Sequence, residues 1–100
     1  MSMKIITIKD WINEPLQSAN TGDTKQWAKK VKAERNARIE KLCEALGCHY
    51  ATISNYANGR YIPSPSNRAK IAEVIQRDVL FKNAFETNII AYYHGKPETN

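Results

Sequence analysis

The sequence predicts an all-α fold of five helices, preceded by a short N-terminal extension. Its 100 residues, of which 42% are hydrophobic, can form one compact domain with a small core. Apolar residues recur at helical spacing through most of the chain, and glycine or proline interrupts them at residues 47, 59, 63 and 65. We expect an extension and linker at residues 1–23, a folded domain at 24–95 and a frayed tail at 96–100.

The N-terminal extension combines a β-branched run with a short helical pattern. Lys4–Ile8 is rich in isoleucine and threonine, which predicts a short strand or extended arm. A brief helix follows, and it should end or kink near Asn13, because Pro15 lacks an N–H and disfavours helix at the residue before it. Trp11 is expected to pack on the domain. The polar run Ser18–Asp23 predicts a linker.

The folded domain is predicted to begin with a helix and to end with two more. Thr24 is expected to cap a first helix that runs to about Arg35. After a proline-rich turn, Ser64 should cap a fourth helix. A fifth helix is expected from Val79 to Tyr93. Its apolar residues recur at intervals near four and form one stripe: Leu80, Phe81, Phe85, Ile89 and Tyr92.

Between these helices lies the stretch that organises the chain. Arg38–Leu46 has the pattern of an amphipathic helix, and Gly47 follows it where a left-handed C-cap is expected. A second helix is predicted at residues 50–58, with Ile53 on its apolar face. Its other face is small and polar and carries no long charged side chain. Two helices joined by so tight a turn form a helix-turn-helix.

Residues 24–76 resemble the lambda-repressor-like helix-turn-helix domain, also called the XRE family. The matching text is Leu42-Cys43-Glu44-Ala45-Leu46-Gly47, Thr52-Ile53-Ser54, Asn58-Gly59-Arg60-Tyr61-Ile62-Pro63-Ser64-Pro65 and Ile71-Ala72. The chain departs from the family at Ile39, where many members have a glutamine that contacts a phosphate. The resemblance implies a DNA-binding regulator of phage or prophage type. It also implies phosphate contacts just beyond the second helix of the motif, from Asn58, Arg60 and Tyr61.

The charge distribution agrees with a nucleic-acid partner. The chain carries a net charge of +5, yet residues 24–77 alone carry eleven basic and four acidic side chains, a net charge of +7. The remainder of the chain is therefore slightly acidic. A basic surface confined to one segment is typical of an electrostatic footprint on phosphates.

Several other functions lack a sequence signal. Cys43 and Cys48 form no zinc-binding pattern with a fourth ligand and are expected to pack in the core as reduced thiols. No paired carboxylates or nucleophile–base pattern indicates an enzyme, and we expect neither a metal nor another cofactor. The chain contains no apolar run of membrane-spanning length and no targeting motif, so a cytoplasmic location is expected, on the bacterial nucleoid or in a phage host.

These observations predict a sequence-specific transcriptional regulator of the repressor type that binds double-stranded DNA. The major groove of B-DNA admits an α-helix and presents distinct patterns of donors and acceptors. The helix at residues 50–58 should read bases, and its reading side chains are Tyr50, Ala51, Ser54 and Asn55. Arg38, expected at a helix N-terminus, should add a phosphate contact.

One motif helix reads too few base pairs to select a genomic site, so we expect a homodimer. The predicted interface is the stripe on the fifth helix, and it consists of Phe81, Phe85, Ile89 and Tyr92. The N-terminal strand is the rival interface.

Two other functions stay open. The acidic flanks, with Trp11 on one side and the aromatic fifth helix on the other, could bind a protein partner, as in the antitoxin of a toxin–antitoxin pair. RNA binding would need more stacking aromatics than Tyr50 and Tyr61 supply.

Overall fold

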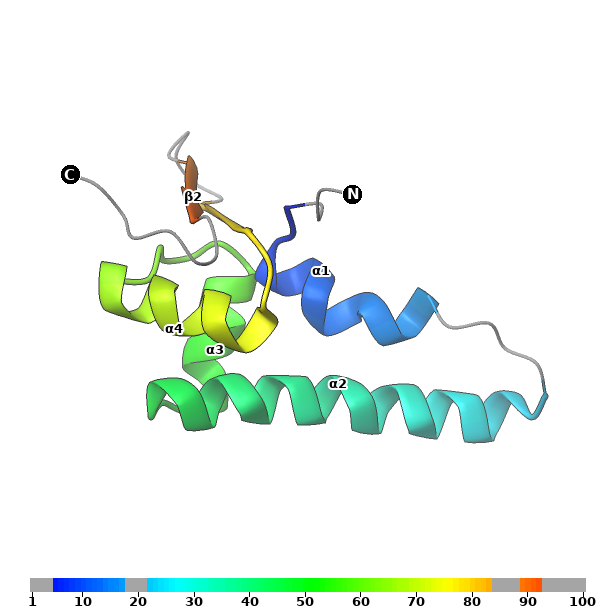
Figure 1. Ribbon diagram of the computed structural model, residues 1–100. Coiled ribbons are helices and arrows are strands. Elements are labelled where there is room, and N and C mark those ends of the chain that lie inside the picture. Colours follow the sequence, from blue (N-terminus) through cyan, green and yellow to red (C-terminus); the bar gives the residue numbers. More distant parts are fainter. Residues whose placement is uncertain (1–4, 18–21, 84–88, 93–100) are drawn as a thin grey trace.

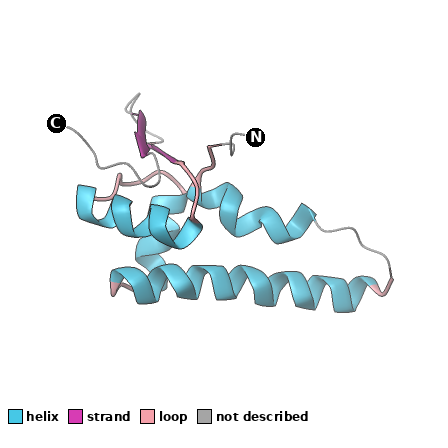
Figure 2. Cartoon of the chain, viewed as in Figure 1, coloured by secondary structure: helices cyan, strands magenta, loops and turns pink. Residues whose placement is uncertain are grey.

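The computed structural model describes residues 5–17, 22–83 and 89–92. In this part of the chain the elements are α1 (Ile8–Asn13), the 3₁₀ helix η1 (Glu14–Gln17), α2 (Thr24–Leu46), α3 (Tyr50–Ala57), α4 (Pro65–Ile75), β1 (Val79–Lys82) and β2 (Ile89–Tyr92). Figure 1 shows the long helix α2 along one side of the molecule, with α1 and α4 lying across from it and α3 between α4 and α2. The fold is mostly helical, with a small two-stranded sheet (Figure 2).

Helix α2 replaces the two helices that were expected at residues 24–35 and 38–46, so the predicted break is wrong. It runs through 23 residues, a length of about 34 Å. The intervening Asn36-Ala37 contains no glycine or proline, and alanine is the strongest helix former, so nothing stops the helix there. Asp23, rather than Thr24, is the N-cap, and its carboxylate accepts a hydrogen bond of 2.9 Å from the backbone N–H of Lys25.

The N-terminal extension joins the core of the domain. The predicted strand is reduced to a single parallel bridge, in which Ile6 pairs with Val79. The Thr7 hydroxyl caps α1 by accepting a hydrogen bond of 3.1 Å from the backbone N–H of Asp10. Helix α1 ends at Asn13, as Pro15 predicted. Trp11 is buried in the core, which confirms that it packs on the domain.

The predicted fifth helix is wrong where the structure describes it. Strands β1 and β2 pair antiparallel, with Val79 opposite Tyr92 and Lys82 opposite Ile89. Burial along β1 alternates, so that Val79 and Phe81 face the core. An apolar spacing of four satisfies a strand period of two as well as a helical face, and β-branched and aromatic residues favour the strand. Residues 84–88, which include Phe85, and the predicted tail at 96–100 lie outside the described residues.

One hydrophobic core contains buried side chains from α1, α2, α3, α4 and β1, and half-buried side chains of β2 pack against it. Its most deeply buried side chains come from four different elements: Leu42, Ile53, Ile71 and Val79. Ile53 therefore fixes α3 against the rest of the domain, as its place on the apolar face predicted. The residues Ile71, Ala72 and Ile75 of α4 are also buried.

Candidate nucleic-acid interface

Local chemistry determines how α3 follows α2. Gly47 ends α2 with a φ of +65°, a left-handed conformation that glycine adopts without steric cost. The backbone N–H of Cys48 then donates a hydrogen bond of 3.1 Å to the carbonyl of Cys43, which closes the turn. Helix α3 begins two residues later, and the buried side chain of Ile53 anchors it. The predicted helix-turn-helix is thus present, with its first helix formed by the C-terminal half of α2.

The four side chains predicted to read bases lie on α3. Tyr50 is 60% exposed and Ala51 is also exposed, so the first turn of the helix is accessible. Ser54 and Asn55 are half-buried. The hydroxyl of Ser54 accepts a hydrogen bond of 3.3 Å from the side-chain amide of Asn58, which leaves its own proton available to an outside acceptor. The structure therefore brings together a short, uncharged and accessible set of hydrogen-bonding groups.

The segment after α3 folds back onto the end of that helix. Gly59 has a φ of +74°, and the backbone N–H of Arg60 donates a hydrogen bond of 2.9 Å to the carbonyl of Asn55. The side chains of Asn58, Arg60 and Tyr61 are all exposed here, Tyr61 by 61%. Their backbone is held against the helix, so the groups predicted to bind phosphate flank the groups predicted to read bases.

Arg38 does not occupy the position expected for a phosphate contact. It lies in the middle of α2, where no helix N-terminus exists, so the predicted position at a helix start is wrong. Its guanidinium donates a hydrogen bond of 2.8 Å to Glu14 and another to the carbonyl of Trp11, and its Cζ lies 5.1 Å from the centre of the Trp11 ring. Glu14 also accepts a hydrogen bond of 2.6 Å from Arg77.

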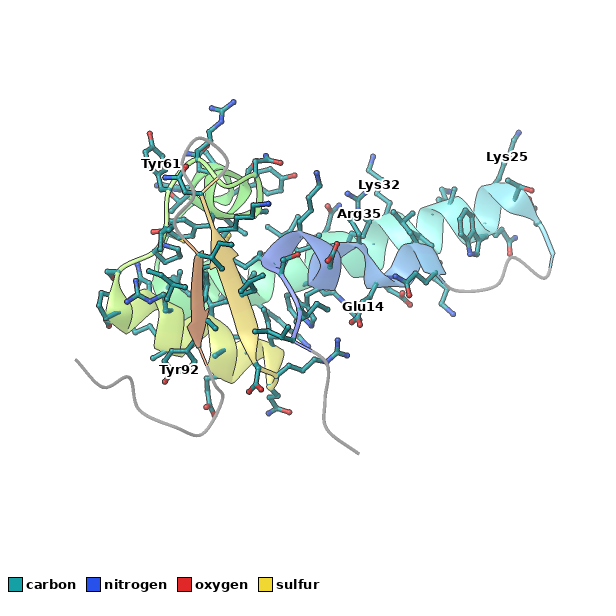
Figure 3. All side chains as sticks on the ribbon, turned by 90° about the horizontal axis from the view of Figure 1, so that it is seen from above. Glu14, Lys25, Lys32, Arg35, Tyr61 and Tyr92 are labelled. Atoms are coloured by element: carbon teal, nitrogen blue, oxygen red, sulfur yellow. The ribbon has the colours of Figure 1, made fainter. Side chains whose placement is uncertain are left out.

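This pair of arginines controls the charge of Glu14. Partial burial disfavours the ionised carboxyl, but the hydrogen bonds and charges of Arg77 and Arg38 outweigh that effect and hold the pKa of Glu14 below its ordinary value. Figure 3 places Glu14 on the side of the molecule opposite Tyr61. Arg38 and Arg77 therefore stabilise the fold, and their charge is already neutralised in part.

Arg35 is a basic side chain beside α3 that no sequence motif indicated. Arg35 of α2 and Asn13 of α1 line a hollow of about 130 Å³, together with Tyr50 and Ser54 of α3. The Nε of Arg35 and the Oδ1 of Asn13 are buried, and neither has a hydrogen-bond partner among the described residues. The sequence could have placed Arg35 beside α3 only if α2 had been predicted as one continuous helix.

The predicted interface residues of the fifth helix separate in the structure. Phe81 is 3% exposed and belongs to the core, so it is not available as an exposed contact. Ile89 is 57% exposed on β2. Tyr92 is half-buried and packs against the core.

The two cysteines are both half-buried and pack against the core. Burial raises the pKa of the Cys43 thiol. No helix in the described residues is long and apolar enough to span a bilayer.

Comparison with known proteins decides the family. The family model described as Helix-turn-helix matches residues 29–81, more than half of the chain. The chain belongs to the XRE-type helix-turn-helix family. No curated protein and no solved structure matches it. The match covers α3 and its flanking segments, and family membership supports a role as a DNA-binding regulator. The family model does not include the segments before residue 29. In this helix-turn-helix protein those segments are α1, η1 and the first turn of α2 with Lys25.

Proposed function

We propose that this helix-turn-helix protein is a sequence-specific repressor that inserts α3 into the major groove of DNA. The observation that carries the proposal is the division of α3 into two faces. Ile53 is buried on one face, and short hydrogen-bonding side chains are accessible on the other. An ordinary solvated helix face carries long charged side chains, whereas the short side chains of α3 let its backbone approach base edges closely.

Each reading residue has a role that its chemistry suits. The carboxamide of Asn55 can pair with N6 and N7 of adenine together. The methyl group of Ala51 can contact the methyl group of thymine, and the hydroxyl of Ser54 can donate or accept. Tyr50 lies at the start of α3, where this motif contacts base edges.

Asn58, Arg60 and Tyr61 bind the phosphates that flank the reading helix. These contacts carry no base information but fix the register of α3 in the groove. The hydrogen bond from Arg60 N–H to the Asn55 carbonyl, 2.9 Å long, supports this division because it couples the phosphate-binding segment to the base-reading helix.

The protein acts as a homodimer, and the interface includes β2. One edge of β1 is bridged by Ile6 and the other pairs with β2, so the outer edge of β2 has no strand partner among the described residues. Such an edge is a template for pairing, and the exposed Ile89 supplies apolar surface beside it. Two copies double the sequence that is read, because each copy binds one half-site.

The dimer can be tested by sedimentation of Ile89→Asp. We expect the wild type to be dimeric and the variant to be a folded monomer. Leu16→Asp, which changes another exposed apolar residue, is the control and should stay dimeric. A dimeric Ile89→Asp protein would exclude the β2 interface.

The sequence suggested a protein-interaction module as the alternative, with Trp11 and the aromatic C-terminal region as anchors. Trp11 and Phe81 are both buried, so neither supplies an exposed anchor in the folded protein. The burial of these two side chains favours the DNA-binding proposal.

Selection of bound duplexes from a random pool tests the proposed function. We expect enrichment of one sequence with two-fold symmetry. Its affinity should fall steeply with salt, because each neutralised phosphate releases counterions. Equal binding to all duplexes would contradict sequence-specific reading, and an absence of salt-dependent binding would contradict DNA binding altogether.

A further inference from the structure

The N-terminal half of α2 carries a row of lysines that the helix-turn-helix motif does not require. Figure 1 shows the first turns of α2 reaching beyond α1 and η1. Lys25, Lys29 and Lys32 are all exposed, and their spacing of four and then three places them on one face of the helix. We call these three side chains, together with Arg35, the lysine face.

The lysine face lies on the same side of the molecule as the segment after α3. Figure 3 shows the side chains of Lys25, Lys32 and Arg35 extending toward the side on which Tyr61 lies, whereas Glu14 and Tyr92 lie on the opposite side. The lysine face and the start of α3 also border the same groove. Lys32 and Arg35 of α2 line one groove with Tyr50, the first residue of α3.

The acidic residue of this helical segment is placed away from the lysine face. Residues 24–36 contain five basic side chains and one acidic side chain, Glu34. Glu34 is four residues from Lys30, so these two share the opposite face of α2 and can compensate each other. Lys25, Lys29 and Lys32 have no ion pair within the described part of the chain.

The length of the lysine face matches a DNA backbone. Lys25 and Lys32 are separated by a helical rise of about 10 Å, which equals the axial rise of about three phosphates on one strand. Arg35 continues the row toward α3, and its buried Nε lacks a partner among the described residues.

We propose that the lysine face binds the DNA backbone outside the segment that α3 reads. Phosphates of one flanking strand contact Lys25, Lys29 and Lys32, and Arg35 contacts the phosphate next to the first turn of α3. This inference rests on the proposed function, because α3 must first place the duplex against this side of the molecule. It extends the footprint beyond the helix-turn-helix itself.

A triple variant, Lys25→Gln with Lys29→Gln and Lys32→Gln, tests the proposal. The matched control is Lys30→Gln with Lys41→Gln and Lys70→Gln, which removes the same charge from exposed positions off the lysine face. The probe is the duplex selected from the random pool, made once as the selected core alone and once with about one helical turn, or about 10 base pairs, added on each side.

We expect the wild type to bind the extended duplex more tightly than the core. The test variant should lose that gain, and the magnitude of its salt slope on the extended duplex should fall by about three for each protomer of the dimer, or about one for each lysine. The control should keep the gain and most of the slope. Hydroxyl-radical footprinting should show protection of the flanks by the wild type and the control only.

The outcomes separate this inference from the proposed function. If the wild type binds the core but does not protect the flanks, the proposal that the lysine face binds DNA is contradicted. The proposal that α3 reads bases would be unaffected. Equal loss of slope in test and control variants would mean that only total charge matters, which also overturns the inference. A wild type that selects no duplex would overturn the proposed function itself.

Discussion

The two sides of this helix-turn-helix protein use basic residues in opposite ways. On one side, Arg38 and Arg77 donate hydrogen bonds of 2.8 and 2.6 Å to the same carboxylate, that of Glu14. On the other side, Arg60 and Lys32 are exposed and have no ion pair in the part of the chain that the structure describes. Figure 3 shows this division, with Glu14 and Lys32 on different sides.

The difference shows why a count of charges does not locate an interface. Arg38 and Arg60 both lie in the basic half of the sequence, and both were predicted to contact a phosphate. Glu14, which comes from outside the matched family segment, engages Arg38 in the fold. An arginine that is already paired with a carboxylate must break that ion pair before it can bind a phosphate, and breaking it costs free energy. The available cations are those without such a partner.

The largest effect is expected on the side proposed to read DNA, from Asn55→Ala. Loss of one two-pronged base contact should cost about 1–3 kcal/mol for the matching base and little for the others. The measurement is the preference of the variant at each position of the selected duplex. Ser66→Ala, an exposed position on α4, serves as the control. Equal weakening on every sequence would show that Asn55 contacts only the backbone.

On the opposite side, Glu14→Gln should destabilise the fold by about 2 kcal/mol, because the amide has one acceptor oxygen in place of two and leaves two half-buried arginines with an uncompensated charge. Denaturant unfolding measures this loss. Glu40→Gln changes an exposed glutamate on α2 and should have little effect. DNA affinity of Glu14→Gln should stay near that of the wild type; a large loss would place Glu14 in the DNA interface instead.

Arg60→Ala should weaken binding to all duplexes almost equally and reduce the magnitude of the salt slope by about one for each protomer of the dimer. The reason is that in the proposed complex Arg60 neutralises a phosphate and reads no base. Lys41→Ala on α2 is the control and should leave the slope unchanged. A changed preferred sequence with an unchanged slope would assign Arg60 to base reading.

The smallest effect is expected from pH. The folded pKa of Glu14 is lowered from its ordinary value of 4.5, so its contribution to stability is fully present above that value. The contribution is lost as the pH falls through the lowered pKa, because the arginines then face a neutral group. Unfolding free energies of the wild type and Glu14→Gln should differ at neutral pH and draw together as the pH falls below 4.5. A difference that does not shrink in the acid range would mean that Glu14 acts through packing.

The helix-turn-helix could be predicted because its signals are local. Gly47 meets the need for a left-handed residue, Ser64 caps α4 by accepting a hydrogen bond of 3.3 Å from Asn67, and Ile53 marks the buried face of α3. Each of these depends on neighbours a few residues away. The division of α3 into an apolar and a small, polar face followed from the same periodicity.

The remaining features depend on contacts between distant segments. The spacing near residues 79–92 fits a helix or a strand, and the backbone pairing of Leu80 with Ile6, at 2.9 Å, favours the strand. The partner of Arg38 lies 24 residues away, a distance at which sequence spacing carries no information. For α2, two helices were expected from the cap at Thr24 and the separate amphipathic pattern of Arg38–Leu46, although Asn36-Ala37 has no residue that stops a helix.

The most direct test maps the contact of the whole protein with DNA by nuclear magnetic resonance. Backbone amide signals are followed while the selected duplex is added, and a duplex of scrambled sequence is the control. We expect the largest changes at residues 50–61, smaller ones in the N-terminal half of α2, and little change around Glu14. The scrambled duplex should spare the amides of α3. Changes centred on Glu14 and η1, with α3 unaffected, would contradict the central claim that α3 reads the DNA.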